Sequence, residues 1–505
     1  MAKAYHVIQI VFVGDWIVFM CRYYFSLFIA VILIITGIGP SFAADYQQIA
    51  GLMDTRTTFS DGKYSIEELV LLARQRGFNV LFINDHDRMA MEYGLPPLRS
   101  ILKKSVEQNS INKQGAGKFI QAIREAEKKY PDMIIIPGSE TVPFYYWTGN
   151  PITGVLTAHN HEKRLLTVGM ENAEDYENLP ILHNSLSLKN IRNAIPELIF
   201  FSAAFIVALI MTFWRGLLRV TGVIALILSV IFTLNSSAFR SSSPFDPYHG
   251  DQKMAPYQLV IDYVNEKGGM TFWNYPETKS GVRKMGPIQV STMPYPAALH
   301  ESRSYTGFAA LYGENVTLTE PGNIWDMTLR EYCAGYRSHP PWGIATADFH
   351  GESKGEDKLG TFPTVFFVRE KTKAAVMKAL RNGNMYAYQG EVPQMMKLDE
   401  FSLSSADGQT RGNSGDTIAL TGSPKIKIAI SSAGAAQNTV KVRLIRAGTL
   451  INVFEEKLPF QIEHTDQYYK PGEKIYYRID VRGPGIIVSN PIFVTFREDK
   501  KSAPP

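Results

Sequence analysis

The residues of this chain that could do chemistry are carboxylates and imidazoles that follow apolar segments. Three segments end in such residues: Asp85 with His86, Glu140, and Asp348 with His350. Carboxylates that meet in one place repel each other and need a cation between them. Oxygen and imidazole ligands suit Mn, Fe or Zn, and a bound divalent ion turns water into hydroxide near neutral pH. These residue types predict a hydrolytic metal centre, although a single Asp-x-His pair is more often structural.

The overall composition is that of an ordinary globular protein, with 45% hydrophobic and 20% charged residues, which excludes a disordered or collagen-like chain. The net charge of +4 over 505 residues gives no reason to expect nucleic acid as a partner. The two cysteines, Cys21 and Cys333, allow neither a disulfide framework nor a CxxC zinc site. Any metal must therefore be held by His, Asp and Glu.

Alternating helices and strands must position these side chains. Ser65 and Glu68 form a capping box, and the helix that follows has one apolar face and ends at Gly77. A buried strand over residues 80–83 then leads to Asp85. Helix–strand alternation implies parallel strands, and barrel folds keep their active sites just past the ends of such strands. We therefore expect an α/β barrel with the polar residues on one rim.

Two apolar segments, residues 198–214 and 220–234, interrupt this pattern. Soluble helices normally show a polar face, and these segments show almost none. We expect a transmembrane helical hairpin over residues 196–235, with a pair of buried core helices as the alternative. Arg215 and Arg219 lie in its turn, which the positive-inside rule places in the cytoplasm. The rest of the chain then lies on the periplasmic or extracytoplasmic side of the membrane.

The first 44 residues have the features of an export signal. Arg22 precedes an apolar run over residues 25–38, and small residues follow the run. This run is short for a membrane span. We expect a signal peptide over residues 1–44, with an uncleaved N-terminal anchor as the alternative, and Met20 is an alternative start to Met1.

From about residue 396 the apolar residues recur with a period of two, and turns rich in Gly, Ser and Asn separate the segments. This pattern predicts a C-terminal β-sandwich. The expected domains are a signal or anchor (1–44), a first barrel part (45–195), the hairpin (196–235), a second barrel part (236–395) and the β-sandwich (396–505).

Several segments of the chain resemble a known family, the polymerase-and-histidinol-phosphatase (PHP) domains. They are TTFSDGKYSIEELVLLARQRGFNVLFINDHD, IPGSE, GGMTFWNYPE and TADFHGE. The likeness is to the extracytoplasmic branch that includes carbaryl-hydrolase-like metallohydrolases, and the C-terminal VRLIRAGTLI resembles the β domain attached to that branch. The resemblance implies a distorted (β/α)7 TIM-like barrel that binds up to three metals and hydrolyses phosphoesters or related bonds.

The residues that match the family are those found first. Asp85 and His86 stand on the family's Asp-His motif, and Glu140 stands on its metal-bridging glutamate. Asp348 and His350 stand on its closing Asp-x-His motif. The resemblance therefore implies that Glu140 is the centre of the site.

Other motif positions depart from the family. Asp54 and Arg56 stand where the opening His-x-His is expected, and Tyr275 replaces the histidine of a His-Pro motif. The ligand expected after Glu140 should precede the strand at residues 165–168; His159 and His161 are near, but Arg164 holds the matching place. Because a guanidinium stays protonated, Arg56 cannot ligate a metal. The loss of imidazoles predicts one or two metals instead of three.

These departures support two main hypotheses. In the first, the chain is a metal-dependent hydrolase of phosphoester or related ester or amide bonds, with one or two divalent ions (Mn, Fe or Zn) and a small, anionic substrate that Arg56 clamps. Its catalytic residues would be Asp54, Arg56 and His350, and its metal ligands Asp85, His86, Glu140, His161, Asp348 and His350.

In the second hypothesis, the barrel is a catalytically inactive binding or signalling module in which Arg56 neutralises Glu140 or Asp348. A third is a membrane-tethered assembly protein whose β-sandwich does the binding.

Overall fold

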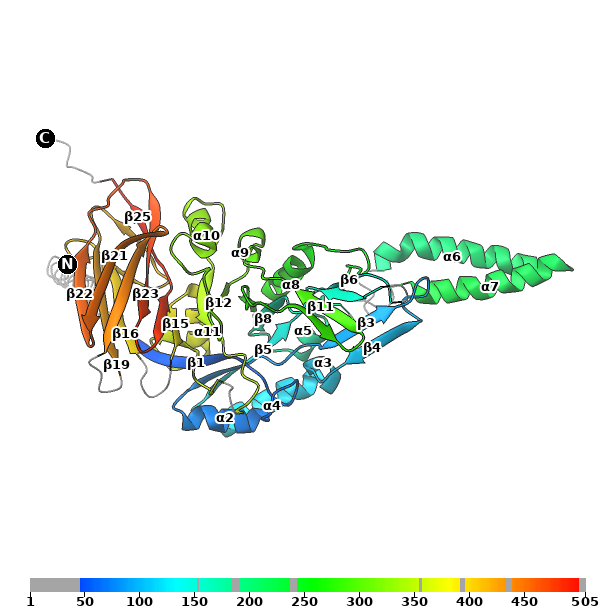
Figure 1. Cartoon of the computed structure of the whole chain (residues 1–505), viewed down its shortest axis with the longest axis horizontal. Coiled ribbons are helices and arrows are strands. Elements are labelled where there is room, and N and C mark those ends of the chain that lie inside the picture. Colours follow the sequence, from blue (N-terminus) through cyan, green and yellow to red (C-terminus); the bar gives the residue numbers. More distant parts are fainter. Residues whose placement is uncertain are drawn as a thin grey trace, which may run out of the picture. The chain divides into compact units, whose positions relative to one another are not determined.

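The polar strand ends belong to one 15-stranded mixed sheet (Figure 1). The computed structural model describes residues 46–151, 154–182, 191–236, 243–353, 357–390, 396–432 and 438–498. The expected signal or anchor over residues 1–44 lies outside the described residues. Seven strands of the sheet carry or adjoin the rim: β1 (Gln47–Thr55), β2 (Val80–Ile83), β5 (Ile134–Thr141), β8 (Arg164–Val168), β9 (Met270–Asn274), β12 (Gly307–Leu311) and β13 (Trp342–Ala345).

Backbone hydrogen bonds bring the two ends of this seven-strand path together. The strands follow one another in the order β13-β12-β9-β8-β5-β2-β1. The segment after β13 then runs beside β1, because the Ala347 amide donates to the Met53 carbonyl at 3.1 Å and the Arg56 amide donates to the Phe349 carbonyl at 2.9 Å. Residues from both ends of the path therefore meet at one rim.

The mixed α/β class is confirmed, but the expectation of uniformly parallel strands is wrong at β8. That strand runs antiparallel to both β5 and β9. As a consequence, the first residue of β8, Arg164, lies beside Asn274, the last residue of β9. The reversal brings the start of a strand, and its arginine, to the rim where the other strands end.

Helices pack on the strands as their apolar faces predict. Helix α2 (Ile66–Gln75) begins with the expected Ser65–Glu68 capping box and buries Ile66, Leu69, Val70 and Ala73. Further helices in the described part of the chain are α3 (Ile111–Gln114), α4 (Ala116–Lys129), α5 (Ala173–Glu177), α8 (Ala255–Glu266), α9 (Ala298–Glu301), α10 (Ile324–Cys333) and α11 (Lys373–Asn382).

Three smaller sheets accompany the main one among the described residues, and two of them lie in the part of the chain before β12. The first pairs β3 (Ala90–Gly94) with β4 (Lys103–Glu107). The second has the order β10-β11-β7-β6 and consists of β6 (Tyr146–Thr148), β7 (Thr157–His159), β10 (Gly281–Met285) and β11 (Ile288–Thr292).

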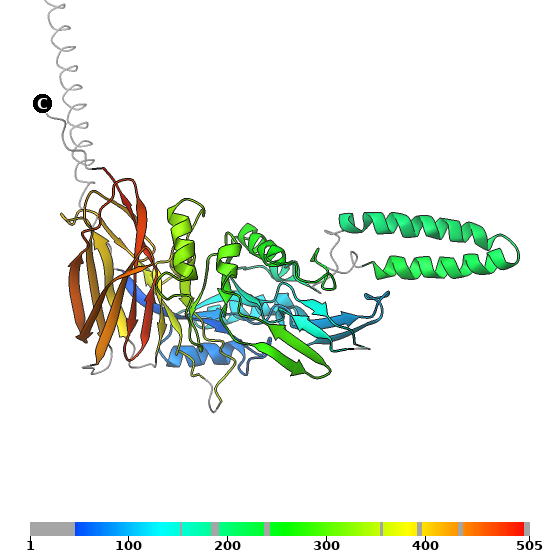
Figure 2. The same cartoon turned by 45° about the horizontal axis from the view of Figure 1, so that its top comes forward.

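The two apolar segments form long helices, α6 (Ile191–Thr212) and α7 (Leu217–Asn235), which lie antiparallel in both views (Figure 2). Both are long and apolar enough to cross a membrane by length and composition. Only 6% and 11% of the residues in their most apolar windows are buried, so they are not the core helices that the alternative expected.

The C-terminal strands continue the main sheet. Strand β14 (Pro363–Val368) pairs with β15 (Met385–Gln389), which pairs with β24 (Ile486–Ser489). The remaining strands of this part are β16 (Met396–Ser404), β17 (Arg411–Asn413), β18 (Thr417–Leu420), β19 (Lys425–Ser432), β20 (Thr439–Arg446), β21 (Thr449–Lys457), β22 (Phe460–Thr465), β23 (Lys474–Arg482) and β25 (Ile492–Phe496). A second sheet, β17-β16-β19-β22, shares a hydrophobic core with this part of the main sheet.

Candidate functional site

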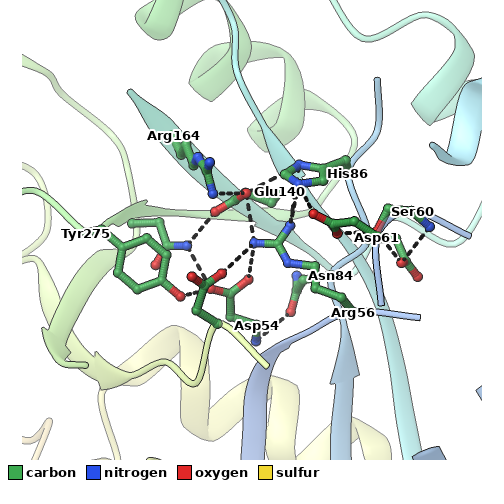
Figure 3. Close-up of polar contacts among 12 residues, drawn as sticks. Asp54, Arg56, Ser60, Asp61, Asn84, His86, Glu140, Arg164 and Tyr275 are labelled. Carbon is green, nitrogen blue, oxygen red and sulfur yellow. Dashed lines mark hydrogen bonds and ion pairs between the residues drawn. The ribbon is translucent and has the colours of Figure 1, made fainter. Parts of the chain in front are cut away.

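Arg56 occupies the centre of the rim (Figure 3). It follows β1 directly and its side chain is fully buried. The Nη2 atom lies 3.1 Å from Asp54 Oδ1, 2.8 Å from Glu140 Oε2 and 3.2 Å from Asp348 Oδ1. One guanidinium nitrogen therefore contacts three carboxylates, which come from three different strand ends.

Glu140, in β5, receives a second arginine. Arg164 Nη1 lies 2.9 Å from Glu140 Oε2, and Asn274 donates to Glu140 Oε1 at 2.8 Å. His86 Nδ1 is 3.3 Å from the same Oε2 atom. Burial alone would raise the pKa of Glu140, but Arg164 and Arg56 outweigh it and lower the pKa to about 2. Glu140 is thus an ionised carboxylate at neutral pH.

Asp54 is held from its other side. Asn274 donates to Asp54 Oδ2 at 2.9 Å, Tyr275 also donates to Oδ2, and the Asp54 amide donates to Asn84 Oδ1 at 3.0 Å. Asp54 has a positive φ of 63°, a backbone state that is rare outside glycine and is fixed here by these contacts. Burial is the largest effect on its carboxyl and raises its pKa to about 6, against the attraction of Arg56.

A short polar chain links the centre to the open side of the rim. Asp61 Oδ2 lies 3.4 Å from His86 Nε2 and 3.3 Å from His350 Nε2. His350 Nδ1 is 2.7 Å from the carbonyl oxygen of Asp348. Burial alone would lower the pKa of His350, but its hydrogen bond to Asp61 raises the pKa to about 9. The imidazole is therefore protonated at neutral pH, with both nitrogens donating.

Asp85 accepts its hydrogen bonds from the loop that follows β1. Its Oδ1 accepts hydrogen bonds from the Thr57 amide (2.7 Å), the Ser60 amide (3.1 Å) and the Ser60 hydroxyl (2.6 Å), and its Oδ2 accepts from the Thr57 hydroxyl (2.6 Å). These contacts fix the loop that carries Asp61. In this arrangement Asp85 supports a loop, and its role as a metal ligand stays a prediction.

His161 lies near the centre without joining it. Its ring packs on Tyr145 with centroids 5.7 Å apart. Burial, followed by the nearby charge of Arg164, lowers the pKa of His161 to about 4. Among the described residues no hydrogen bond or ion pair joins His161 to Glu140; Arg164 takes that place instead.

Sequence reasoning brought together Asp54, Arg56, His86, Glu140, Asp348 and His350, and the structure places all six at this rim. It missed Asp61 and Asn274. Both lie within segments that resemble the family, TTFSDGK and GGMTFWNYPE, but neither stands at a motif position matched above. Asp61 was one polar residue of a turn-like stretch, and nothing in the spacing showed that it would lie between two imidazoles.

The residues as arranged do not fit a divalent ion. The oxygens of Asp54, Glu140 and Asp348 do converge, but the point on which they converge is Arg56 Nη2. A metal bound about 2.0–2.2 Å from such oxygens needs the space that the guanidinium fills. Within the described parts of the chain, no group of three or more His, Cys, Asp and Glu has an arrangement that could hold a metal ion.

Comparisons with known proteins give structural neighbours at low similarity. No family model and no curated protein matches the chain. A two-domain protein from Bacteroides vulgatus, described as containing a predicted PHP-like metal-dependent phosphoesterase, is 11% identical with a TM-score of 0.36, and the match covers 86% of this chain and 90% of that chain.

Two other solved structures match a smaller part of the chain. A protein from Bifidobacterium adolescentis, proposed in its description to be a metal-dependent phosphoesterase, is 16% identical with a TM-score of 0.27. An amidohydrolase from Chromobacterium violaceum, with bound sulfate and no metal, is 15% identical with a TM-score of 0.26. Each match covers 61% of this chain and 90% of the other. At these scores the neighbours carry no argument about the activity of this chain.

Proposed function

We propose that this chain is a membrane-anchored, extracytoplasmic protein of the PHP type in which arginine replaces the metal, and that it acts as a binding or signalling module. The observation that carries this proposal is the contact of Arg56 Nη2 with Asp54, Glu140 and Asp348. The PHP assignment rests on the sequence motifs. The arginines stand where those motifs lead us to expect imidazole ligands.

The charges of Arg56 and Arg164 support a permanent replacement of the metal by arginine. Burial works against a buried guanidinium, but Glu140, Asp54 and Asp348 outweigh it and hold the pKa of Arg56 well above its usual value. Arg164 supplies a second fixed positive charge next to Glu140. Two guanidiniums thus compensate the buried carboxylates as metal ions would, but they have no empty orbital with which to lower the pKa of a bound water.

The same contacts argue against Arg56 as a clamp for a substrate anion. Arg56 is fully buried and its Nη2 atom is already shared by three carboxylates. The groups left at the open side are Asp61, His350 and Asp348, whose side chain is 46% exposed. We propose that a small-molecule ligand is recognised through these hydrogen-bonding groups.

The second candidate function is the metal-dependent hydrolase expected from the family. The observation that favours it is the convergence of three carboxylate oxygens on one point, with His86 next to it. It requires Arg56 to leave that point, so that one or two divalent ions could take its place.

Membrane anchoring rests on α6 and α7. Apolar side chains along both helices are exposed, among them Phe200, Ile206, Leu217 and Ile227. Arg215 lies in the turn between the helices and Arg219 lies near the start of α7, which supports a cytoplasmic turn. We therefore propose that the rest of the described chain lies on the extracytoplasmic side.

Hydrolysis assays separate the two candidate functions. The full chain in detergent is incubated with phosphomonoester, phosphodiester and aryl carbamate substrates, with Mn, Fe or Zn added and then with a chelator. The proposal predicts no turnover above that of the Asp348→Ala variant. Turnover that a chelator removes, and that Asp348→Ala lacks, would establish the hydrolase instead.

Reporter fusions test the topology. A reporter that is active only in the cytoplasm should be silent when fused after Pro505 and active when inserted beside Gly216 in the hairpin turn. Cytoplasmic activity of the C-terminal fusion would overturn the extracytoplasmic placement.

A further inference from the structure

The loop between β3 and β4, residues 95–102, presents apolar side chains to solvent. Leu95, Ile101 and Leu102 are 44%, 39% and 51% exposed, and Val106 in β4 is 56% exposed. Two exposed lysines, Lys103 and Lys104, directly follow the loop. We name residues 95–106 the β3–β4 tip. An apolar stretch next to basic residues is typical of segments that lie in a membrane interface.

The β3–β4 tip is hydrogen-bonded to the end of a proposed membrane helix. The Ser100 amide donates to Asn235 Oδ1 at 3.0 Å, and Asn235 Nδ2 donates to the Pro97 carbonyl at 3.1 Å. Asn235 is the last residue of α7. The tip therefore lies at the same height along the axis of α7 as the end of that helix.

The length of α7 fixes that level relative to the bilayer. At about 1.5 Å per residue, its 19 residues span about 28 Å, close to the hydrocarbon thickness of about 30 Å. If the turn at Gly216 is at the cytoplasmic surface, Asn235 is at the opposite surface. The residues bonded to Asn235 then lie at the boundary between hydrocarbon and headgroups.

The tip is also held in shape, so its apolar side chains do not fold inward. The Leu95 amide donates to the Leu102 carbonyl at 2.8 Å, and the Leu102 amide donates to the Leu98 carbonyl at 2.7 Å. Arg99 stacks on Tyr248 at 3.8 Å from the ring centroid. A loop fixed in this way keeps its apolar surface available for a partner.

We propose that the β3–β4 tip lies in the headgroup layer of the membrane crossed by α6 and α7, with Leu102 in the interface and Lys104 at anionic phospholipid headgroups. This inference rests on the proposed membrane hairpin. It adds a second membrane contact, made by the extracytoplasmic part of the chain itself. That contact would fix the orientation of this part relative to the bilayer surface.

A fluorescent label at Leu102 tests the inference. Leu102→Cys is made in the full chain with Cys21→Ser and Cys333→Ser, labelled with an environment-sensitive dye, and reconstituted into vesicles of phosphatidylglycerol and phosphatidylcholine. Leu450→Cys, which is 42% exposed in β21, is the matched control. We expect lipids with a nitroxide at the headgroup to quench the label at residue 102 and not at residue 450. Val106→Cys is a second label position if the first variant does not fold.

The variant Lys104→Glu tests whether the positive charge of Lys104 contacts anionic headgroups. Lys457→Glu in β21 is its control. We expect Lys104→Glu alone to weaken quenching at residue 102, and we expect weaker quenching in vesicles without phosphatidylglycerol. Equal quenching with and without that lipid would overturn the assignment of anionic headgroups.

The outcomes separate this inference from the proposed function. If alkaline carbonate extracts the protein from membranes, the membrane hairpin is wrong and the inference fails with it. If the protein resists extraction but residues 102 and 450 are quenched alike, only the inference is overturned. Protection of residue 102 in detergent that disappears on dilution would identify a second copy of the chain as the occupant, and would also overturn it.

Discussion

Arg56 Nη2 lies 2.8 Å from Glu140 Oε2, and both side chains are fully buried. In the family that the sequence resembles, the glutamate at this position bridges metal ions. Here it bridges two arginines, because Arg164 Nη1 contacts the same oxygen at 2.9 Å. The binding-module hypothesis expected Arg56 to neutralise Glu140 or Asp348. Arg56 contacts both, and it contacts Asp54 as well.

Removal of the guanidinium should strongly destabilise the protein. Arg56→Met leaves Asp54 and Glu140 buried without their shared cation, which costs about 3–5 kcal/mol of unfolding free energy. We expect a correspondingly lower urea midpoint for the full chain in detergent with a chelator present. The control Arg74→Met removes an exposed pair with Asp132 and should cost no more than about 1 kcal/mol. Equal effects of the two variants would contradict a buried cation at the centre.

The C-terminal strands should depend on a buried ion pair with the rest of the chain. Arg478 in β23 donates to both carboxylate oxygens of Asp326 in α10, at 2.8 and 2.7 Å, and both side chains are fully buried. Asp326→Asn removes one partner and should cost about 3–5 kcal/mol in the same unfolding measurement.

Lys427→Gln, which removes an exposed pair with Glu463, is the control for Asp326→Asn and should cost under about 1 kcal/mol. The ion pair of Asp326 and Arg478 also predicts the effect of removing the C-terminal strands. Deletion of residues 396–505 would remove the arginine partner of Asp326 and expose the edge of β15, so we expect the truncated chain to be insoluble. A soluble, folded truncation would show that this contact is dispensable.

The pair of Asp61 and His350 should make stability depend on pH. The pKa of His350 is raised to about 9 in the folded protein and is about 6.5 when unfolded. The folded protein therefore binds the proton more tightly, and the contribution of the pair is complete below about pH 6.5 and is lost as the pH rises through about 9. Between about pH 7 and pH 10, the wild type should lose more stability than His350→Gln. Parallel pH profiles of the two proteins would contradict this pairing.

Local features of the fold were predictable because they depend on short-range chemistry. The capping box of Ser65 and Glu68, the buried face of α2 and the strand at Val80–Ile83 are present as expected. The reversal of β8 was not predictable, because the same apolar residues suit a parallel or an antiparallel neighbour. The ladder between β15 and β24 was also missed, since a change in hydrophobic period suggests a domain boundary even where a sheet crosses it.

The candidate site was predictable as a set of residues but not as an arrangement. Motif matching identified Glu140, Asp348 and the unusual Arg56, and strand ends placed them on one rim. Motif matching could not show that both carboxylate oxygens of Asp85 would accept hydrogen bonds from Thr57 and Ser60, four in all. Such contacts depend on the path of a loop, which the residue types alone do not determine.

The metal content of the purified protein tests the central claim most directly. The full chain, extracted in detergent without chelators, is analysed by inductively coupled plasma mass spectrometry beside Arg56→His, which removes the guanidinium and places an imidazole near Asp54, Glu140 and Asp348. We predict far less than one equivalent of Mn, Fe or Zn in the wild type and about one equivalent in the variant. Stoichiometric metal in the wild type that is lost in Asp348→Ala would contradict the replacement of metal by arginine.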